Sequence, residues 1–161
     1  MNRDPIEALS ETVKSNLHWA AVLSRLSMAS LFLSAAIFKV PGGVSGTVGY
    51  YQGLLQKSLL PSFLITAHAS AIMFVEFGLG LWLLSGYRLA LAWRAAALVL
   101  VSLAVGMIFA AKFDVASDNY VYVFLAIIGL LLSHFDRWTL GVKREAREPV
   151  AERSSGARAA A

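Results

Sequence analysis

The sequence contains no cysteine in 161 residues, and this excludes several kinds of chemistry from the chain itself. Disulfide frameworks, thiolate zinc sites, iron–sulfur clusters and covalently attached c-type haem all need cysteine. Charged residues are also scarce, at 15%, and the mean hydropathy is +0.65, which excludes an ordinary soluble domain. With 58% hydrophobic residues, the sequence predicts an integral membrane protein.

The sequence has only three histidines, and its basic residues do not form a stripe of the kind that binds nucleic acid. The net charge is +4, but the basic residues cluster beside apolar segments, so we expect no nucleic-acid partner. Of the three histidines, His18 and His134 flank apolar segments close to Trp19 and Trp138. This arrangement is typical of an aromatic belt at the membrane surface and does not predict a haem pair or a metal site.

Four apolar windows are present, at residues 17–38, 61–84, 89–111 and 120–135. A membrane-spanning helix needs roughly 20 apolar residues. The windows therefore predict an all-α membrane protein, built as a four-transmembrane-helix bundle. The first window could instead be a secretory signal, but the chain is already apolar from Leu17, ahead of Arg25, and we expect this helix to be retained.

Three regions are expected along the chain: an N-terminal segment at 1–16, a four-helix domain at 17–141 and a basic, disordered tail at 142–161. Asp4 and Pro5 are typical of a helix start, so residues 1–16 predict a short amphipathic helix on the membrane surface, with a frayed tail as the alternative. Between the first two spans, Pro41 breaks the helix, and the apolar spacing that follows predicts an interfacial or re-entrant helix.

The basic residues also predict an orientation. An even number of spans places both termini on one side, and most of the Lys and Arg residues outside the spans lie on that side. By the positive-inside rule we expect both termini to be cytoplasmic, in a plasma membrane of the bacterial inner-membrane type.

Apart from Arg94, which is just inside the third span, two charged residues fall inside the predicted spans. Arg25 lies eight residues after Leu17, and Glu76 lies eight residues before Leu84, so each is expected about 12 Å deep. Because an unpaired charge at that depth is costly, we expect Arg25 and Glu76 to form a pair. Two interpretations stay open: a structural clip between the first two spans, or a proton site at Glu76 whose affinity Arg25 adjusts.

Further polar residues could line the same bundle. Lys39 follows Arg25 on one helix face, with Met28, Phe32 and Ala36 between them, and a matching face on the second span holds Ala69, Met73, Glu76 and Gly80. His68, Lys39 and Asn119 fall at similar depth, where donors and aromatic rings would suit a quinone headgroup. The last span carries Asn119, Tyr122, Ala126, Gly129 and Ser133 on one face, for which close helix packing is the alternative role.

The order of these residues resembles the DoxX family. The resemblance is carried by Leu23-Ser24-Arg25-Leu26, Ala35-Ala36-Ile37-Phe38-Lys39, Tyr50-Tyr51, Leu60-Pro61, Val75-Glu76-Phe77-Gly78, Leu83-Leu84-Ser85-Gly86, Asp118-Asn119 and Arg137-Trp138-Thr139-Leu140. It covers about Leu23 to Gly141. The chain departs from the family at Ala36, where a glycine is usual, and at Phe77, which precedes a single glycine where a pair is common.

The resemblance implies a four-helix membrane subunit linked to quinone-dependent oxidation of sulfur compounds or to redox-stress complexes. It implies functional roles for Arg25, Lys39, Glu76 and Asn119; His68 and Tyr122 come from the residue pattern alone. On this hypothesis Glu76 handles protons and Arg25 adjusts its proton affinity. The residues that contact a quinone or a related small apolar ligand are Lys39, His68, Asn119 and Tyr122, while other subunits of an oxidoreductase supply the electrons. A non-catalytic membrane anchor that contacts lipid and other subunits is the alternative, and a small transporter is a third, weaker interpretation.

Overall fold

The computed structural model describes residues 5–140, and every regular element in that range is a helix. The elements are α1 (Pro5–Lys39), the 3₁₀ turn η1 (Val40–Gly42), α2 (Gly43–Leu54), α3 (Ser62–Ser85), α4 (Leu89–Phe109) and α5 (Phe113–Leu132). Four helical stretches are long and apolar enough to cross a membrane. The first runs from Ser10 through α2 to Leu54, and the others are α3, α4 and α5. The prediction of an all-helical chain with four such stretches is confirmed.

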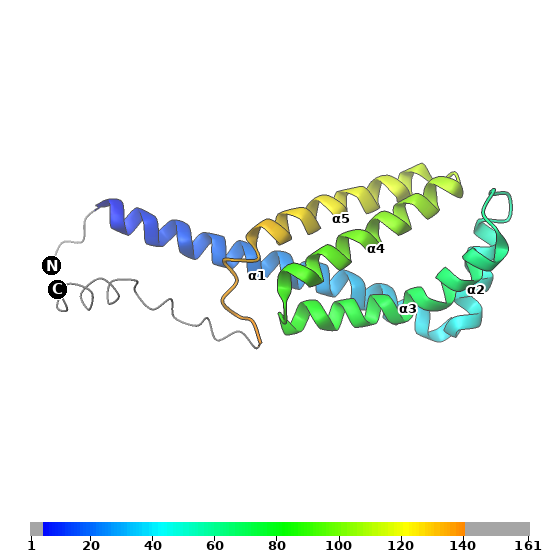
Figure 1. Ribbon diagram of the computed structural model, residues 1–161, viewed down its shortest axis with the longest axis horizontal. Helices are drawn as coiled ribbons and strands as arrows, with labels where there is room; N and C mark the ends of the chain where they lie inside the picture. Colours follow the sequence, from blue (N-terminus) through cyan, green and yellow to red (C-terminus); the bar gives the residue numbers. More distant parts are fainter. Residues whose placement is uncertain (1–4, 141–161) are drawn as a thin grey trace, which may run out of the picture.

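The four long helices form a closed ring (Figure 1). Helix α1 packs on α3, α3 on α4, α4 on α5, and α5 on α1. The core between them is apolar and almost fully buried; its largest side chains include Trp93, Phe32, Met28, Leu83 and Leu100. The predicted faces of α1 and α3 therefore do point inward, because Met28, Phe32 and Ala36 on one helix and Ala69 and Gly80 on the other are all buried.

Glycines allow the helices to approach closely at two places. A Cβ atom at Gly129 on α5 would lie 2.2 Å from the Trp93 ring of α4, and one at Gly80 on α3 would lie 2.6 Å from the Leu33 side chain of α1. The small residues of α5 thus pack within the bundle, as the close-packing interpretation predicts.

Helix α2 lies at one end of the bundle and packs on the first half of α3 (Figure 1). Its buried face joins a second apolar cluster that includes Tyr51, Leu55, Ile65, Ile72 and Met107. The predicted helix after Pro41 is therefore present. We call this the α2 end, and the opposite end, which holds residues 85–88 and 133–140, the turn end.

Two boundaries differ from the predictions. Helix α1 runs without a break from Pro5 to Lys39 and extends beyond the bundle in Figure 1, so no separate N-terminal helix forms. Helix α5 begins at Phe113, seven residues before the predicted span, because Asp114 in its first turn favours the helix although it interrupts the apolar run. The start at Pro5 agrees with the predicted helix start, whereas Asp4 and the tail at 142–161 lie outside the described residues.

Candidate functional site

At the α2 end, Lys39 and Glu76 form an ion pair inside the bundle. Lys39 Nζ lies 2.5 Å from Glu76 Oε2 and also donates a hydrogen bond to Ala35 O at 3.2 Å. Glu76 is 2% exposed, and its neighbour Lys39 is half-buried. Lys39, the last residue of α1, thus neutralises a carboxylate in the middle of α3. An unpaired charge at such a position would be costly.

A pocket of about 260 Å³ lies at the same end of the bundle, between α2, α3 and α4. Its walls are mainly apolar, from Leu55, Leu60, Ile65, Leu103 and Met107, with Gly106 leaving space on α4. Around its open side stand exposed apolar side chains, among them Leu64, Val105 and Phe109. The pocket therefore opens toward an exposed apolar surface of the helices.

Two aromatic side chains give this pocket its main polar character. Tyr51 on α2 and His68 on α3 both line it, and their rings meet edge to face with centroids 6.1 Å apart. The negative charge of Glu76 lies close enough to act electrostatically on both. A ligand in the pocket would therefore meet a phenol and an imidazole, whereas Lys39 and Glu76 do not line the pocket.

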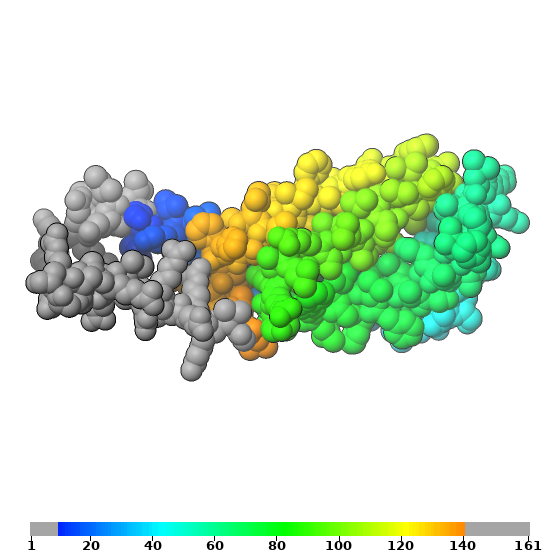
Figure 2. Space-filling model, in the orientation of Figure 1, coloured from blue at the N-terminus to red at the C-terminus, as the bar shows by residue number. Residues whose placement is uncertain are grey.

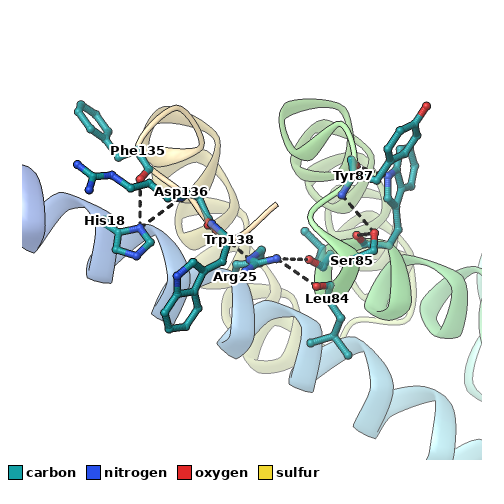
Figure 3. A network of polar contacts seen from close by, with 11 residues as sticks. His18, Arg25, Leu84, Ser85, Tyr87, Phe135, Asp136 and Trp138 are labelled. Carbon is teal, nitrogen blue, oxygen red and sulfur yellow. Dashed lines mark hydrogen bonds and ion pairs between the residues drawn. The ribbon is translucent and has the colours of Figure 1, made fainter. Parts of the chain in front are cut away.

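At the turn end, Arg25 makes a second buried charge cluster (Figure 3). Its Nη1 donates hydrogen bonds to Leu84 O at 3.1 Å and Leu83 O at 3.4 Å, at the last turn of α3. Its Nε lies 2.9 Å from Asp136 Oδ2, an ion pair whose angles do not satisfy a hydrogen bond. A cation at the C-terminus of a helix satisfies carbonyls that lack intrahelical partners and is favoured by the helix dipole.

The segment after α5 is held against this cluster. Asp136 Oδ1 accepts a hydrogen bond from Trp138 N at 2.9 Å, and Leu140 N donates to Ser85 O at 3.1 Å. His18 Nδ1 lies 3.2 Å from Phe135 O and 3.3 Å from Arg137 N, so either tautomer finds a backbone partner. Arg25 thus connects α1, the end of α3 and residues 136–140, as Figure 3 shows.

The predicted pairing of Arg25 with Glu76 is wrong. The ends of the apolar windows do not give the depth of these residues, because α1 is longer than its window. Arg25 lies level with the last turn of α3. Side chains on a helix point toward its N-terminus, and the Lys39 side chain runs back to Ala35, which lets it reach Glu76. The partners are therefore exchanged: Arg25 with Asp136, and Glu76 with Lys39.

The other predicted residues lie in different places. His68 lines the pocket, whereas Asn119 and Tyr122 do not. Asn119 Nδ2 donates to Val115 O of its own helix at 2.9 Å, and Tyr122 packs against the core cluster around Trp93. Within residues 5–140, no group of three or more His, Asp or Glu residues is placed to hold a metal ion.

The sequence pattern missed Tyr51 and Asp136 as site residues. Tyr51 lies on the apolar face of the predicted connecting helix, and from that position its burial could have been predicted. Asp136 follows the last apolar window, where an acidic residue is usually solvated. The only indication of a role for Asp136 is that Arg25 needs an acidic partner inside the bundle, and the sequence offers Glu76 as that partner.

Residues 5–140 thus form a helical structure with four stretches able to span a membrane, two buried ion pairs, and an apolar pocket at the end that holds the Lys39–Glu76 pair. Comparison with protein-family models, with curated proteins and with solved structures gives no match.

Proposed function

We propose that this chain is a multi-pass membrane protein that binds a quinone or a similar small lipophilic ring in the pocket at the α2 end, as a DoxX-like accessory subunit of a redox complex. The pocket lined by Tyr51 and His68, at the end that holds the Lys39–Glu76 pair, carries this proposal. At about 260 Å³ it is smaller than the roughly 300–1,000 Å³ typical of drug-sized ligands, so it suits one ring. A hydrophobic tail would leave through the open, lipid-facing side.

The chemistry of the pocket supports this ligand class. A quinone carries two carbonyl acceptors, and the Tyr51 hydroxyl and the His68 ring both offer donors. Reduction of a quinone consumes protons, and Glu76 is a carboxylate that acts electrostatically on both donors. The proposed contribution of the chain is to bind the ring, orient its carbonyls and hold a proton at Glu76. Without cysteine, the electrons come from a partner subunit.

Gly106 offers a direct test of the pocket. It lines the pocket, and a Cβ atom built there meets nothing within 4 Å, so a side chain can start from this position and Gly106→Leu adds an apolar group at the pocket wall. We expect a short-chain ubiquinone analogue, titrated into the protein in lipid nanodiscs, to bind saturably and to bind Gly106→Leu at least tenfold more weakly. Gly78→Leu, at an open site outside the pocket, is the matched control. Equal binding by both variants, or no saturable binding, would contradict the proposal.

Glu76 is tested through turnover. In the purified complex, Glu76→Gln should abolish quinone-coupled activity while quinone binding and helix content are kept. The double variant Lys39→Gln/Glu76→Gln removes the cation that would otherwise remain partly buried without its partner, and it separates loss of chemistry from loss of stability. Full activity in Glu76→Gln would end the proton role.

A non-catalytic membrane anchor is the second candidate, and one observation favours it. Both buried ion pairs are complete within the chain, so neither needs a ligand. The anchor would not use the small residues of α5, because Gly129 already packs on Trp93. This candidate predicts that Glu76→Gln lowers assembly of the complex and leaves the turnover of each assembled complex unchanged.

A further inference from the structure

A large groove opens at the turn end, between the start of α4 and the segment after α5. Its volume is about 840 Å³, and its polar lining includes Lys14, Arg88, Arg94 and Arg137. In Figure 2 the orange surface of residues 133–140 lies beside the green surface of the start of α4. The groove thus collects basic residues from three parts of the chain at one end of the bundle.

Among residues 5–140, no carboxylate neutralises the three arginines of this groove. Arg88, Arg94 and Arg137 form no ion pair with any residue from 5 to 140, and Lys14 pairs only with exposed Glu11. Asp136 is the one carboxylate in the lining, and its charge is matched by Arg25. Three arginines facing one concave surface favour an anion, because guanidinium groups bind phosphate with paired hydrogen bonds.

The backbone of α4 contributes to the same surface. Leu89 and Ala90, in its first turn, line the groove, and that turn holds no acidic residue and no side-chain cap. Arg88, which precedes them, has a φ of 44°, a left-handed conformation that costs a non-glycine residue about 1–2 kcal/mol. The strained turn places the Arg88 side chain at the groove, beside backbone N–H groups that lack intrahelical acceptors.

The aromatic residues of the turn end mark where the lipid headgroups would lie. Trp19 and Trp138 are both exposed, and their rings pack edge to face at 5.4 Å, with His18 in contact with both. Exposed Trp residues at the ends of apolar helices are typical of the membrane–water interface. The groove also has exposed apolar walls, at Leu91 and Phe135, which a soluble anion would not need.

We infer that this groove binds the headgroup of an anionic phospholipid, with its phosphate on Arg88, Arg94 and Arg137 and its acyl chains against Leu91 and Phe135. The site is separate from the pocket at the α2 end and does not depend on a quinone binding there. It gives the chain a fixed lipid at the turn end, where basic pockets beside membrane helices recognise acidic headgroups.

The test uses native mass spectrometry of the full chain in mixed micelles of phosphatidylglycerol and phosphatidylcholine. We expect one phosphatidylglycerol to be retained in preference to phosphatidylcholine. Arg94→Gln/Arg137→Gln should bind it roughly thirtyfold more weakly, because the variant removes two of the basic residues that contact the headgroup. Lys57→Gln/Lys112→Gln changes the net charge equally at exposed positions outside the groove and should bind as the original chain does.

The result can overturn the inference in three ways: no preference for the anionic lipid, full affinity in Arg94→Gln/Arg137→Gln, or equal loss in both double variants. A titration with inorganic phosphate separates the two sources of the anion. Displacement of the lipid by millimolar phosphate would make the groove a soluble-anion site and not a lipid site.

Discussion

Gly86, in the turn between α3 and α4, is closely surrounded by other atoms of the turn end. Its φ is +67°, and a Cβ atom there would lie 2.8 Å from Arg25 Nη1 and 3.0 Å from the Thr139 Cα. The residue therefore needs glycine twice, once for its left-handed conformation at the end of α3 and once for the guanidinium that caps this helix. Because both constraints require glycine at position 86, a single substitution there tests the geometry of the turn end.

Gly86→Ala is expected to destabilise the protein by about 2 kcal/mol or more, from the left-handed backbone and the displaced Arg25. Gly78→Ala is the control, because its Cβ atom meets nothing within 4 Å in a helix interior, where alanine is favoured by about 1 kcal/mol. Thermal unfolding in detergent, followed by circular dichroism, measures both. Equal melting temperatures for the two variants would contradict this view of the turn.

Asp136 is the second residue to test. Its side chain is 0% exposed and that of Arg25 is 5% exposed, so Asp136→Asn leaves a buried guanidinium without its counter-charge. We expect a loss of about 3 kcal/mol, typical of removing one partner of a buried pair, and a much smaller loss for exposed Asp118→Asn. Adding Arg25→Gln to Asp136→Asn should cost less than the sum of the single changes; strict additivity would show that the pair is not coupled.

At the scale of helices, α4 and α5 pack along each other, and at one place the Trp93 ring of α4 lies directly against Gly129 of α5. Gly129→Ala places a methyl group against the Trp93 ring, where the Cβ atom would lie 2.2 Å away, and overpacking of this kind costs about 1–3 kcal/mol. Adding Trp93→Phe to Gly129→Ala should restore part of the lost stability, because a phenyl ring is smaller than an indole and leaves room for the added methyl group. Gly106→Ala, at an open position of α4, should not lower the unfolding midpoint and should raise it slightly, because alanine is favoured over glycine within a helix.

The helices themselves could be predicted from the sequence, because long apolar windows leave few alternatives in a membrane. The boundaries were less predictable: Asp114 and Asp118 made the first turns of α5 look like a loop, and the polar start of α1 looked like a separate element. A helix can continue beyond the apolar window, and only tertiary contacts show how far it does.

The candidate site was predictable only in part. Glu76, Lys39 and His68 were recognised as polar residues inside or at the edge of the bundle, and they do gather at the α2 end. Their partners were not predictable, because pairing depends on the relative shift of α1 and α3 along their axes. That shift is set by packing, such as Gly80 against Leu33, and not by the ends of the apolar windows.

On the scale of the whole molecule, the two ends have different characters. The turn end is held together by Arg25, Asp136 and backbone carbonyls and carries the basic groove. The α2 end carries the apolar pocket and the Lys39–Glu76 pair. We therefore expect substitutions at the turn end to act on stability and lipid binding, and substitutions around the pocket to act on ligand binding.

The most direct test of the proposed function is purification from the native membrane in mild detergent, followed by mass spectrometry of solvent-extracted lipophilic molecules. We expect a near-stoichiometric quinone or similar ring compound with the unaltered chain and with Gly78→Leu, and its loss from Gly106→Leu. A chain that purifies in a stable complex with partner proteins but without any such compound would contradict ligand binding in the pocket and favour a membrane anchor.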